Sequence, residues 1–523
     1  MKKIGLIILL LVLVITSAIK IQAVSGNNFP FTMDQGRDMI DIRQMVLSKS
    51  PRLIGPTTSI NGVFLGPFWY YFLLPPFLVS GGNPQILMYW QIIWYQLSVI
   101  FLWWVIKKTN PKFAIFTAIL LLFSQTSFNT GHYFWNANAM PIMTLFYFGT
   151  LFISLKKPST LNLIILGIVS GLSLQVEAAF GILFFPFSFV YLALRNKKIL
   201  LLLHLTFGFV VTLIPQVIFE LRHQFIMTKV LVAELLGKGT ILGEKMTVAE
   251  RLLERWQSLL NQIKDLSYIP ENFVYLLFVL GIIATVYLVL KSSRKNISIN
   301  FGFISLFFSI FSGVFFLLFS QHLKPWYILG ISVPFVLILA YVLDYLSSKN
   351  ITLKYIVFGI LVLNIFFALT FQIKHLTSTV FSTSNDPSQL KNLMIDVDWA
   401  YTEAKGSAFY AYNYVPSVYD YALNYLYWWY GTKTYGYQPS VVAYLPNQPE
   451  YITGGSITWT KTKLENSTNP TILIIESDKE HPLLQEAWEG NFSHLCETNE
   501  KVFPWNSKIK SLSECNSLSL NDK

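Results

Sequence analysis

Long apolar runs that are almost free of charge recur along this chain of 523 residues. Only 13% of its residues are charged, against about 25% in a soluble globular domain, and 53% are hydrophobic. About 20 apolar residues suffice for a helix to cross a bilayer. The sequence therefore predicts an α-helical polytopic membrane protein of about 11 transmembrane helices, at 4–19, 85–106, 113–125, 139–155, 161–176, 180–194, 199–219, 273–290, 300–320, 327–346 and 355–371.

The basic residues predict the orientation of these helices. Alternate short connections carry 15 Lys and Arg residues and no acidic residue. The positive-inside rule places such connections in the cytoplasm, with the N-terminus inside and the C-terminus outside. The connections in question contain Lys2/Lys3, Lys107/Lys108/Lys112, Lys156/Lys157, Arg195/Lys197/Lys198, Lys291/Arg294/Lys295 and Lys349/Lys354. We expect a multi-pass protein of the cytoplasmic (plasma) membrane.

Three pieces then face the outside. Two are loops, 22–84 and 220–271, within a transmembrane domain at 1–373, and the third is a C-terminal domain at 374–523. The first span resembles a signal peptide, but its apolar core exceeds the usual ~7–15 residues and Ile21-Gln22-Ala23 is a poor cleavage site. An uncleaved anchor is the preferred interpretation.

The C-terminal domain differs in composition from the rest. From Leu376 onward it holds 10 Lys/Arg and 16 Asp/Glu, a net charge of −6 within a chain of net charge +11. Short β-like runs alternate with Gly, Pro, Asn and Ser, which predicts a small α+β domain. Its Cys496 and Cys515 form either a disulfide or two separate thiols. The aromatic stretch 409–437 either packs as a core, which we favour, or stacks on an acceptor glycan.

The first outer loop concentrates charge. Asp34, Arg37, Asp38, Asp41 and Arg43 lie within ten residues, and apolar residues recur between them at helical spacing. This predicts a short amphipathic helix lying on the membrane. Asp34 stands near its start, where it acts as a helix cap, as a catalytic base, or as both.

Two further outer segments combine aromatic and polar residues. The run 55–76 contains Tyr70 among Gly, Pro and Trp residues and predicts an interfacial segment or an aromatic belt. The turn 131–141 contains Trp135, Asn136 and Asn138. These side chains bind a sugar by stacking and hydrogen bonding, or the asparagines cap the helix that follows.

The remaining candidates are charged residues at the outer ends of spans. Glu177 is the one formally charged residue between Pro158 and Leu194, and a carboxylate there is either functional or solvated at the interface. Arg222, followed by His223, offers a planar fork suited to phosphate. Lys324, followed closely by Tyr327, offers a second cation. Both cations bind either a donor phosphate or ordinary lipid head groups.

Other chemistries find little support in the sequence. It contains no Walker-type phosphate loop, no Cys/His zinc spacing and no Gly-x-Ser-x-Gly elbow. Asp396-Val397-Asp398 resembles a metal-bound sugar-nucleotide motif, but one such triplet arises easily by chance. No metal site and no required cofactor are expected, and a nucleic-acid partner is excluded by the placement of the basic residues.

Several of these segments, in this order, resemble the GT-C superfamily of polytopic glycosyltransferases. The resemblance is to the bacterial branch related to protein O-mannosyltransferases, the aminoarabinose transferase of lipid A and Rgt-type lipopolysaccharide-core transferases, and it covers roughly 1–371. The matching segments are Asp34-Gln35-Gly36-Arg37-Asp38, Gly55-Pro56-Thr57-Thr58-Ser59, Gly66-Pro67-Phe68-Trp69-Tyr70-Tyr71, Trp135-Asn136-Ala137-Asn138, Glu220-Leu221-Arg222-His223-Gln224-Phe225 and Pro325-Trp326-Tyr327.

The resemblance implies a sugar donor on a polyprenyl phosphate and transfer of the sugar to an envelope glycan, lipid or protein outside the cytoplasm. Asp34 matches the acidic residue that acts as base in the first outer loop of such families. Arg222 and Lys324 would bind the donor phosphate. These roles require Asp34 and Arg222 to face a common cleft. Relatives often carry His where Glu177 stands, so no role is carried over to it. The alternative from another class is a lipid or sugar transporter or flippase.

Overall fold

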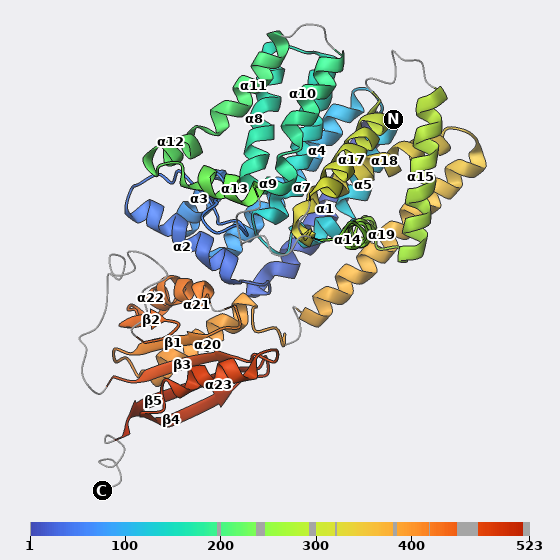
Figure 1. Ribbon diagram of the computed structural model, residues 1–523. Coiled ribbons are helices and arrows are strands. Elements are labelled where there is room, and N and C mark those ends of the chain that lie inside the picture. The colour runs from blue at the N-terminus through green and yellow to red at the C-terminus, as the bar shows by residue number, and fades with distance from the viewer. Residues whose placement is uncertain are drawn as a thin grey trace. The chain divides into compact units, whose positions relative to one another are not determined.

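The computed structural model describes residues 2–195, 200–236, 246–291, 300–319, 322–379, 384–417, 419–446 and 469–515 (Figure 1). The chain forms two compact units. The bundle unit comprises Met1–Gln22, Arg52–Leu73 and Leu87–Lys374, and the tail unit comprises Ala23–Pro51, Leu74–Ile86 and His375–Lys523. Residues 23–51 of the first outer loop thus pack with the C-terminal part of the chain.

The bundle unit consists of helices, and some of these helices extend into the tail unit. Its α-helices are α1 (Lys2–Val24), α3 (Phe68–Ser80), α4 (Pro84–Lys107), α5 (Pro111–Leu122), α6 (Gln125–Thr130), α7 (Met140–Lys156), α8 (Thr160–Val176), α9 (Ala178–Gly181), α10 (Phe184–Arg195), α11 (Leu200–Thr212), α12 (Ile214–Arg222), α13 (Ile226–Leu235), α14 (Val248–Lys264), α15 (Glu271–Lys291), α17 (Phe301–Leu318), α18 (Ser332–Leu346) and α19 (Ile351–Thr379). Two 3-10 turns, η2 (Ala137–Ala139) and η3 (Pro325–Ile331), precede α7 and α18.

Every expected span coincides with helix in the part of the chain that the structure describes. Eight helices there are long and apolar enough to cross a membrane, and nine if the bent pair α11 and α12 counts as one span. The spans expected at 113–125 and 161–176 are the shorter apolar helices α5 and α8. The chain is therefore a multi-pass membrane protein, while the count of eleven stays a prediction.

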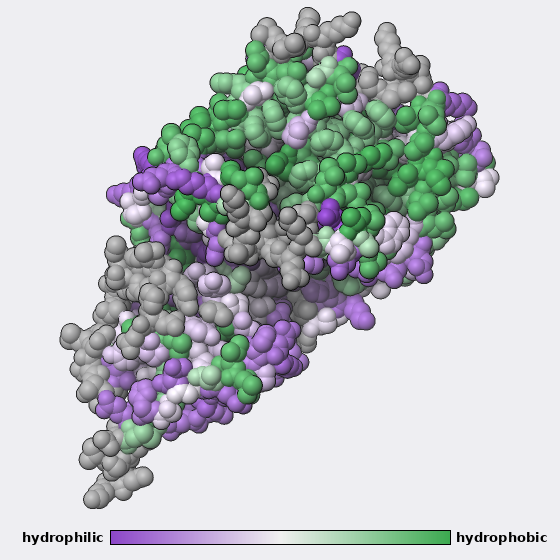
Figure 2. Space-filling model, viewed as in Figure 1, coloured by the Kyte–Doolittle hydropathy of each residue, from purple (hydrophilic) through white to green (hydrophobic). Residues whose placement is uncertain are grey.

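The surface of the bundle matches this assignment. Large apolar side chains such as Leu11, Val14, Leu280 and Ile283 are about half exposed or more along α1 and α15. Figure 2 shows broad apolar surface over the helices of the bundle. Surface of this kind on single helices is stable in lipid rather than in water.

The tail unit is built on a five-stranded sheet (Figure 1). Its strands are β1 (Tyr410–Tyr414), β2 (Val441–Ala443), β3 (Thr471–Glu476), β4 (Leu495–Val502) and β5 (Ser507–Glu514), in the order β2-β1-β3-β5-β4. The β1 strand is parallel to β2 and β3, whereas β5 is antiparallel to β3 and β4. The predicted α+β domain is confirmed.

Both faces of the sheet are covered, because β3 is buried along almost its whole length. Leu473 and Ile475 pack with Trp488 of α23 (Pro482–Gly490). Residues 472 and 474 point to the other face of the sheet, because successive residues of a strand alternate between faces. The helix α20 (Leu390–Glu403) lies on that side, where its Asp396 accepts a hydrogen bond from Ser507 of β5. Further helical turns are η1 (Ser25–Asn27), α21 (Tyr421–Leu426), the π-helical turn η4 (Tyr427–Gly431) and α22 (Thr432–Tyr435).

The two cysteines lie at the open end of the β4–β5 hairpin. Cys496 is in β4, Cys515 directly follows β5, and a disulfide joins them. This decides between the two alternatives that the sequence left open.

The aromatic stretch 409–437 is mostly core, as favoured from the sequence. Tyr425 and Tyr427 are fully buried, and Trp429 and Tyr437 nearly so. Tyr419 is exposed and stacks on Tyr421, with ring centroids 5.6 Å apart.

The Asp396-Val397-Asp398 triplet does not gather its carboxylates. Asp396 accepts hydrogen bonds from Trp505 Nε1 at 3.1 Å and Ser507 Oγ at 2.8 Å. Asp398 accepts from the hydroxyls of Tyr430 and Tyr435 at 3.0 and 2.7 Å. Residues two apart on a helix point in different directions, so each carboxylate has its own partners.

The buried Asp396 predicts a pH-dependent stability of the tail unit. Burial raises the pKa of its carboxyl from 3.8 to about 7. The folded state therefore holds this proton more tightly than the unfolded state between about pH 4 and pH 7, and the free energy of unfolding falls as the pH rises through that window. The change is on the order of a few kcal/mol.

We expect hydrogen exchange of the β5 amides, corrected for intrinsic rates, to be faster at pH 8 than at pH 5.5 in the wild type. Asp396→Asn keeps a polar partner for Trp505 and Ser507 but removes the titration, so its pH dependence should be clearly shallower. An equal dependence in the two proteins would contradict the assignment.

Candidate functional site

The acidic segment of the first outer loop forms α2 (Met33–Leu47) in the tail unit. Its N-cap is Thr32, which forms a capping box with Gln35. Gln35 Oε1 accepts a hydrogen bond from the Thr32 amide at 2.7 Å. The interpretation of Asp34 as the helix cap is therefore wrong, because Asp34 lies inside the first turn and its carboxylate is not used to cap it.

Asp34 instead belongs to a charged cluster on α2. Arg37 donates to Asp34 through Nη1 at 2.9 Å and to Asp38 through Nη2 at 2.8 Å. The side chain of Asp38 is 2% exposed, whereas that of Asp34 is 21% exposed. Arg37 thus holds both carboxylates in place, and Asp34 is the more exposed of the two.

The position of α2 is set by close packing on α21. A Cβ atom built on Gly36 would lie 2.5 Å from the backbone of Tyr421 and Ala422. Met39 and Ile42 of the same helix are fully buried. The expectation that α2 lies on the membrane by its apolar side is therefore wrong, since protein covers that side.

The second half of the first outer loop, residues 55–67, folds as a hairpin in the bundle unit, which we call the loop hairpin. The amide of Gly55 donates to Leu65 O at 2.8 Å, and the amide of Thr58 donates to Val63 O at 3.0 Å. A Cβ atom on Gly66 would lie 2.3 Å from the side chain of Gln175. The loop hairpin is thus pressed against the end of α8.

Gln175 was not predicted, although it connects three elements. Its Oε1 accepts from the Phe68 amide at 3.1 Å, and its Nε2 donates to Thr212 O at 2.5 Å, at the bend between α11 and α12. The residue is 2% exposed. A buried amide that satisfies backbone groups of two distant segments leaves no local signal in the sequence.

Tyr70 follows the loop hairpin in α3 and lies in the packed interior with 2% exposure. Its neighbour Trp69 is fully buried. The interpretation of these two residues as part of an aromatic belt at the membrane surface is therefore wrong, because protein covers them both.

Glu177 lies directly after α8 and is the N-cap of α9. Its Oε1 accepts a hydrogen bond from the Ala179 amide at 3.2 Å, and the residue is 8% exposed. The interpretation as a solvated interfacial carboxylate is therefore wrong. The buried carboxylate also contributes to the electrostatic environment of Tyr327.

The turn that contains Trp135 packs beside Glu177. Asn136 Nδ2 donates to Val176 O at 2.8 Å, so this amide closes the end of α8. Asn138 Nδ2 donates to Tyr133 O at 3.0 Å, and α7 has no side-chain cap, so Asn138 does not cap it. Trp135 meets Trp326 edge to face, with ring centroids 5.5 Å apart.

Tyr327 connects η3 to the loop hairpin. Its hydroxyl lies 2.7 Å from Ser59 Oγ. Lys324, at the start of η3, is exposed.

The segment before η3 is held by α14, which sequence reasoning did not single out. Arg255 donates to Phe316 O and Phe319 O at 3.1 and 3.0 Å, satisfying carbonyls at the end of α17. Glu254 Oε1 accepts from the Leu323 amide at 2.8 Å. These bonds fix both ends of the connection that leads to Lys324.

Arg222 ends α12 and its side chain is exposed. The neighbouring Glu220 accepts from the amides of Met227 and Thr228 at 2.9 Å each and so fixes the turn. The ring of His223 stacks on Phe219 with centroids 4.0 Å apart. Its Nδ1 lies 2.8 Å from Phe219 O, so this nitrogen is occupied within the helix end.

The loop hairpin is the common neighbour of several predicted residues in the bundle unit. Phe64 contacts Phe219 of α12 at 6.1 Å between ring centroids, and Ser59 reaches Tyr327. The helix end with Arg222 and the turn with Lys324 therefore both border it. Asp34, Arg37 and Asp38 belong to the tail unit, so the common cleft of Asp34 and Arg222 stays a prediction.

Comparison with known proteins gives a match in structure only. No protein-family model and no curated protein matches the sequence. The structure of ArnT from Cupriavidus metallidurans in the apo state matches with a TM-score of 0.60 at 14% identity, over 98% of this chain and 98% of that chain. ArnT from the same organism bound to undecaprenyl phosphate matches with a TM-score of 0.57 at 13% identity, over 96% and 97%.

A third match, to the archaeal oligosaccharyltransferase AglB from Archaeoglobus fulgidus, has a TM-score of 0.43 and 14% identity, over 80% of this chain and 63% of that one. The two ArnT structures show that the chain has the ArnT fold over nearly its whole length, which confirms the fold expected from the resemblance to GT-C proteins.

The contact of Gly36 with α21 predicts that Gly36→Ala displaces α2. A methyl group has no space there, and overpacking of this kind typically costs 1–3 kcal/mol. We expect the amides of α2 to lose protection against hydrogen exchange by roughly tenfold in the full chain, while the β3 amides keep theirs. Gly490→Ala is the matched control, since nothing lies within 4 Å of a Cβ atom there. Equal protection of α2 in both variants would contradict the packing.

Proposed function

We propose that this chain is a glycosyltransferase of the cytoplasmic membrane that moves a hexosyl or pentosyl group from a polyprenyl phosphate to an envelope acceptor outside the cytoplasm. The observation that carries the proposal is the ArnT fold, which extends over nearly the whole of both chains. One of the matching ArnT structures contains undecaprenyl phosphate, which supports a lipid-phosphate donor.

The proposed reaction is an inverting displacement. The acceptor hydroxyl oxygen attacks the anomeric carbon of the sugar, and Asp34 accepts the hydroxyl proton as general base. The bond between the anomeric carbon and the phosphate oxygen breaks, and the electron pair leaves with the polyprenyl phosphate. Support for Asp34 comes from its chemistry and exposure: it is ionisable, partly exposed, and oriented by Arg37 at 2.9 Å.

Cations stabilise the charge that the leaving phosphate gains. Arg222 and Lys324 are proposed for this role because both side chains are exposed on segments that border the loop hairpin. The donor has a single phosphate, so two protein cations can neutralise it, and the proposed mechanism uses no metal. Trp135 and Tyr327 stand as candidates for contacts with the sugar ring.

Asp34→Asn tests the base. The amide keeps an oxygen for Arg37 but accepts no proton, so we expect kcat to fall by about 10²- to 10⁴-fold. The measurement is transfer of radiolabelled sugar from a polyprenyl phosphate to acceptor in vesicles that contain the full chain. Asp41→Asn, on the same helix, is the matched control and should transfer at close to the wild-type rate.

If Asp34→Asn transferred normally, or if only Asp41→Asn were inactive, the assignment of the base would be wrong. If the wild type moved the intact labelled lipid across the bilayer without transferring the sugar, the chain would be a flippase rather than a transferase.

Arg222→Gln tests the phosphate contact. Loss of hydrogen bonds to a charged group costs about 1.5–3 kcal/mol, so we expect kcat/KM for the donor to fall roughly tenfold to hundredfold. Arg222→Lys keeps the charge without the fork and should lie between the two. Lys229→Gln removes an exposed cation from the neighbouring helix α13 and should leave kcat/KM unchanged. An equal fall in kcat/KM in Arg222→Gln and Lys229→Gln would contradict a specific phosphate contact, because general surface charge would then explain the effect of Arg222.

A further inference from the structure

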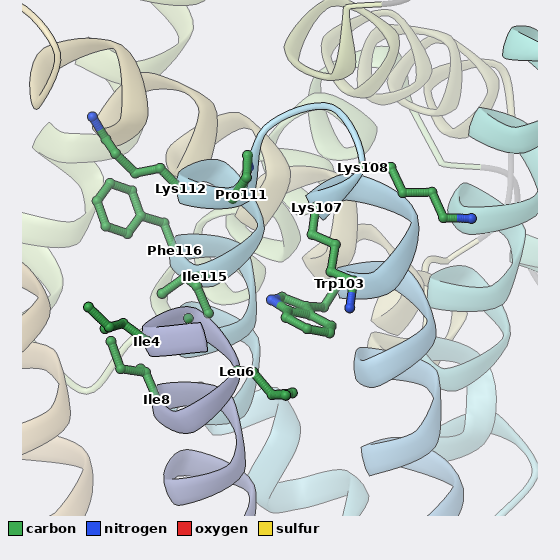
Figure 3. A pocket seen from close by; sticks show the side chains of 11 residues that line it. Ile4, Leu6, Ile8, Trp103, Lys107, Lys108, Pro111, Lys112, Ile115 and Phe116 are labelled. Carbon is green, nitrogen blue, oxygen red and sulfur yellow. The ribbon is translucent and has the colours of Figure 1, made fainter. Parts of the chain in front are cut away.

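A groove opens in the bundle unit where α1, α4 and α5 meet (Figure 3). Its volume is about 410 Å³, within the usual range of ligand pockets. The lining combines apolar side chains with lysines: Ile4, Leu6, Ile8, Trp103, Lys107, Lys108, Pro111, Lys112, Ile115 and Phe116, together with Gly5.

The groove lies at the end of the bundle away from the loop hairpin. Lys112 donates to Ser348 Oγ at 2.7 Å, next to the C-terminal end of α18, whereas η3 with Tyr327 precedes the N-terminal end of the same helix. The 15 residues of α18 span about 22 Å. The groove is therefore a separate site from the one proposed for sugar transfer.

The apolar walls of the groove come from two helices. Figure 3 shows Ile4 and Ile8 of α1 on the side of Ile115 and Phe116 of α5. Ile4 is 62% exposed. An apolar groove on the outside of a membrane bundle is filled by hydrocarbon, because water there would leave the apolar walls hydrated.

The rim of the groove carries excess positive charge. Lys107 lies 3.8 Å from the centre of the Trp103 ring, and Figure 3 shows both side chains beside the groove. Asp344 lies 3.5 Å from Lys112 and balances that cation. In the part of the chain that the structure describes, no carboxylate pairs with Lys107 or Lys108. Lys108 lies 3.1 Å from the centre of the Trp104 ring, and Figure 3 shows its side chain directed away from Trp103. An anion at the rim would therefore meet the Lys107 ammonium group.

We propose that this groove binds one anionic phospholipid of the cytoplasmic leaflet. An acyl chain lies along Ile4, Ile8 and Phe116, and the phosphate lies against Lys107. The positive-inside rule assigns this end of the bundle to the cytoplasm. Basic pockets between transmembrane helices on that side suit anionic head groups, and each Lys near such a surface contributes about 1 kcal/mol.

The test is native mass spectrometry of the purified full chain, titrated with phosphatidylglycerol or with phosphatidylcholine of the same acyl chains. We expect one phosphatidylglycerol to be retained with at least fivefold preference over phosphatidylcholine. Lys107→Gln should reduce the affinity for phosphatidylglycerol about fivefold, which is 1 kcal/mol at 25 °C. Lys349→Gln is the matched control, because it removes a cation just beyond Ser348 that does not line the groove.

A second variant tests the acyl-chain part of the groove. Gly5 faces Ile115, with 3.5 Å between a built Cβ atom and Ile115 Cγ1, so Gly5→Phe would fill the groove without changing its charge. This variant should lose binding of both lipids. Circular dichroism should show unchanged helix content in every variant.

Equal affinity for the two lipids, or equal losses in Lys107→Gln and Lys349→Gln, would overturn the proposal. Displacement of the lipid by millimolar inorganic phosphate would also overturn it, because the site would then bind a soluble anion. None of these results depends on sugar transfer.

Discussion

Two glycines, one in each half of the first outer loop, allow the loop to pack closely on the rest of the protein, because neither position has room for a methyl group. Gly36 brings α2 against the backbone of Tyr421 and Ala422, and Gly66 brings the loop hairpin against the buried side chain of Gln175. Contacts as close as these cannot relax around an added carbon without moving backbone or a buried amide. The acidic helix is thereby fixed on the tail unit, and the hairpin on the bundle.

Polar side chains near the loop hairpin mainly form hydrogen bonds with backbone groups. Asn136 and Gln175 donate to carbonyls at the end of α8 and at the bend of α11, and Arg255 donates to carbonyls at the end of α17. A bilayer offers no hydrogen-bond partners, so helix ends and bends near it must find partners within the protein. Several residues that look like ligands in the sequence are therefore structural. Arg222 and Lys324, which we propose for the donor phosphate, are exposed at the same end.

Much of the fold could be predicted from the sequence, because the membrane spans and the tail have strong local sequence patterns. Apolar length placed the membrane spans, although not α13 and α14 in the loop 220–271, and short β-like runs indicated strands in the tail. One readable signal was missed: Thr32 and Gln35 have the spacing of a capping box, which would have excluded Asp34 as the cap. The roles of Asn136 and Gln175 could not have been predicted, since each depends on a partner about 40 residues or more away. The burial of Glu177, which excludes a solvated carboxylate, likewise could not have been predicted, because its surroundings come from other helices.

The reaction that we propose for the chain breaks the bond between a sugar and a polyprenyl phosphate. The most direct measurement follows the wild-type full chain in vesicles with a synthetic α-linked polyprenyl-phosphate sugar and membrane acceptor. It counts the polyprenyl phosphate released and determines the anomeric configuration of the product by NMR. We expect one polyprenyl phosphate per sugar transferred and a β-linked product. Recovery of the donor intact, or a product with retained configuration, would contradict it.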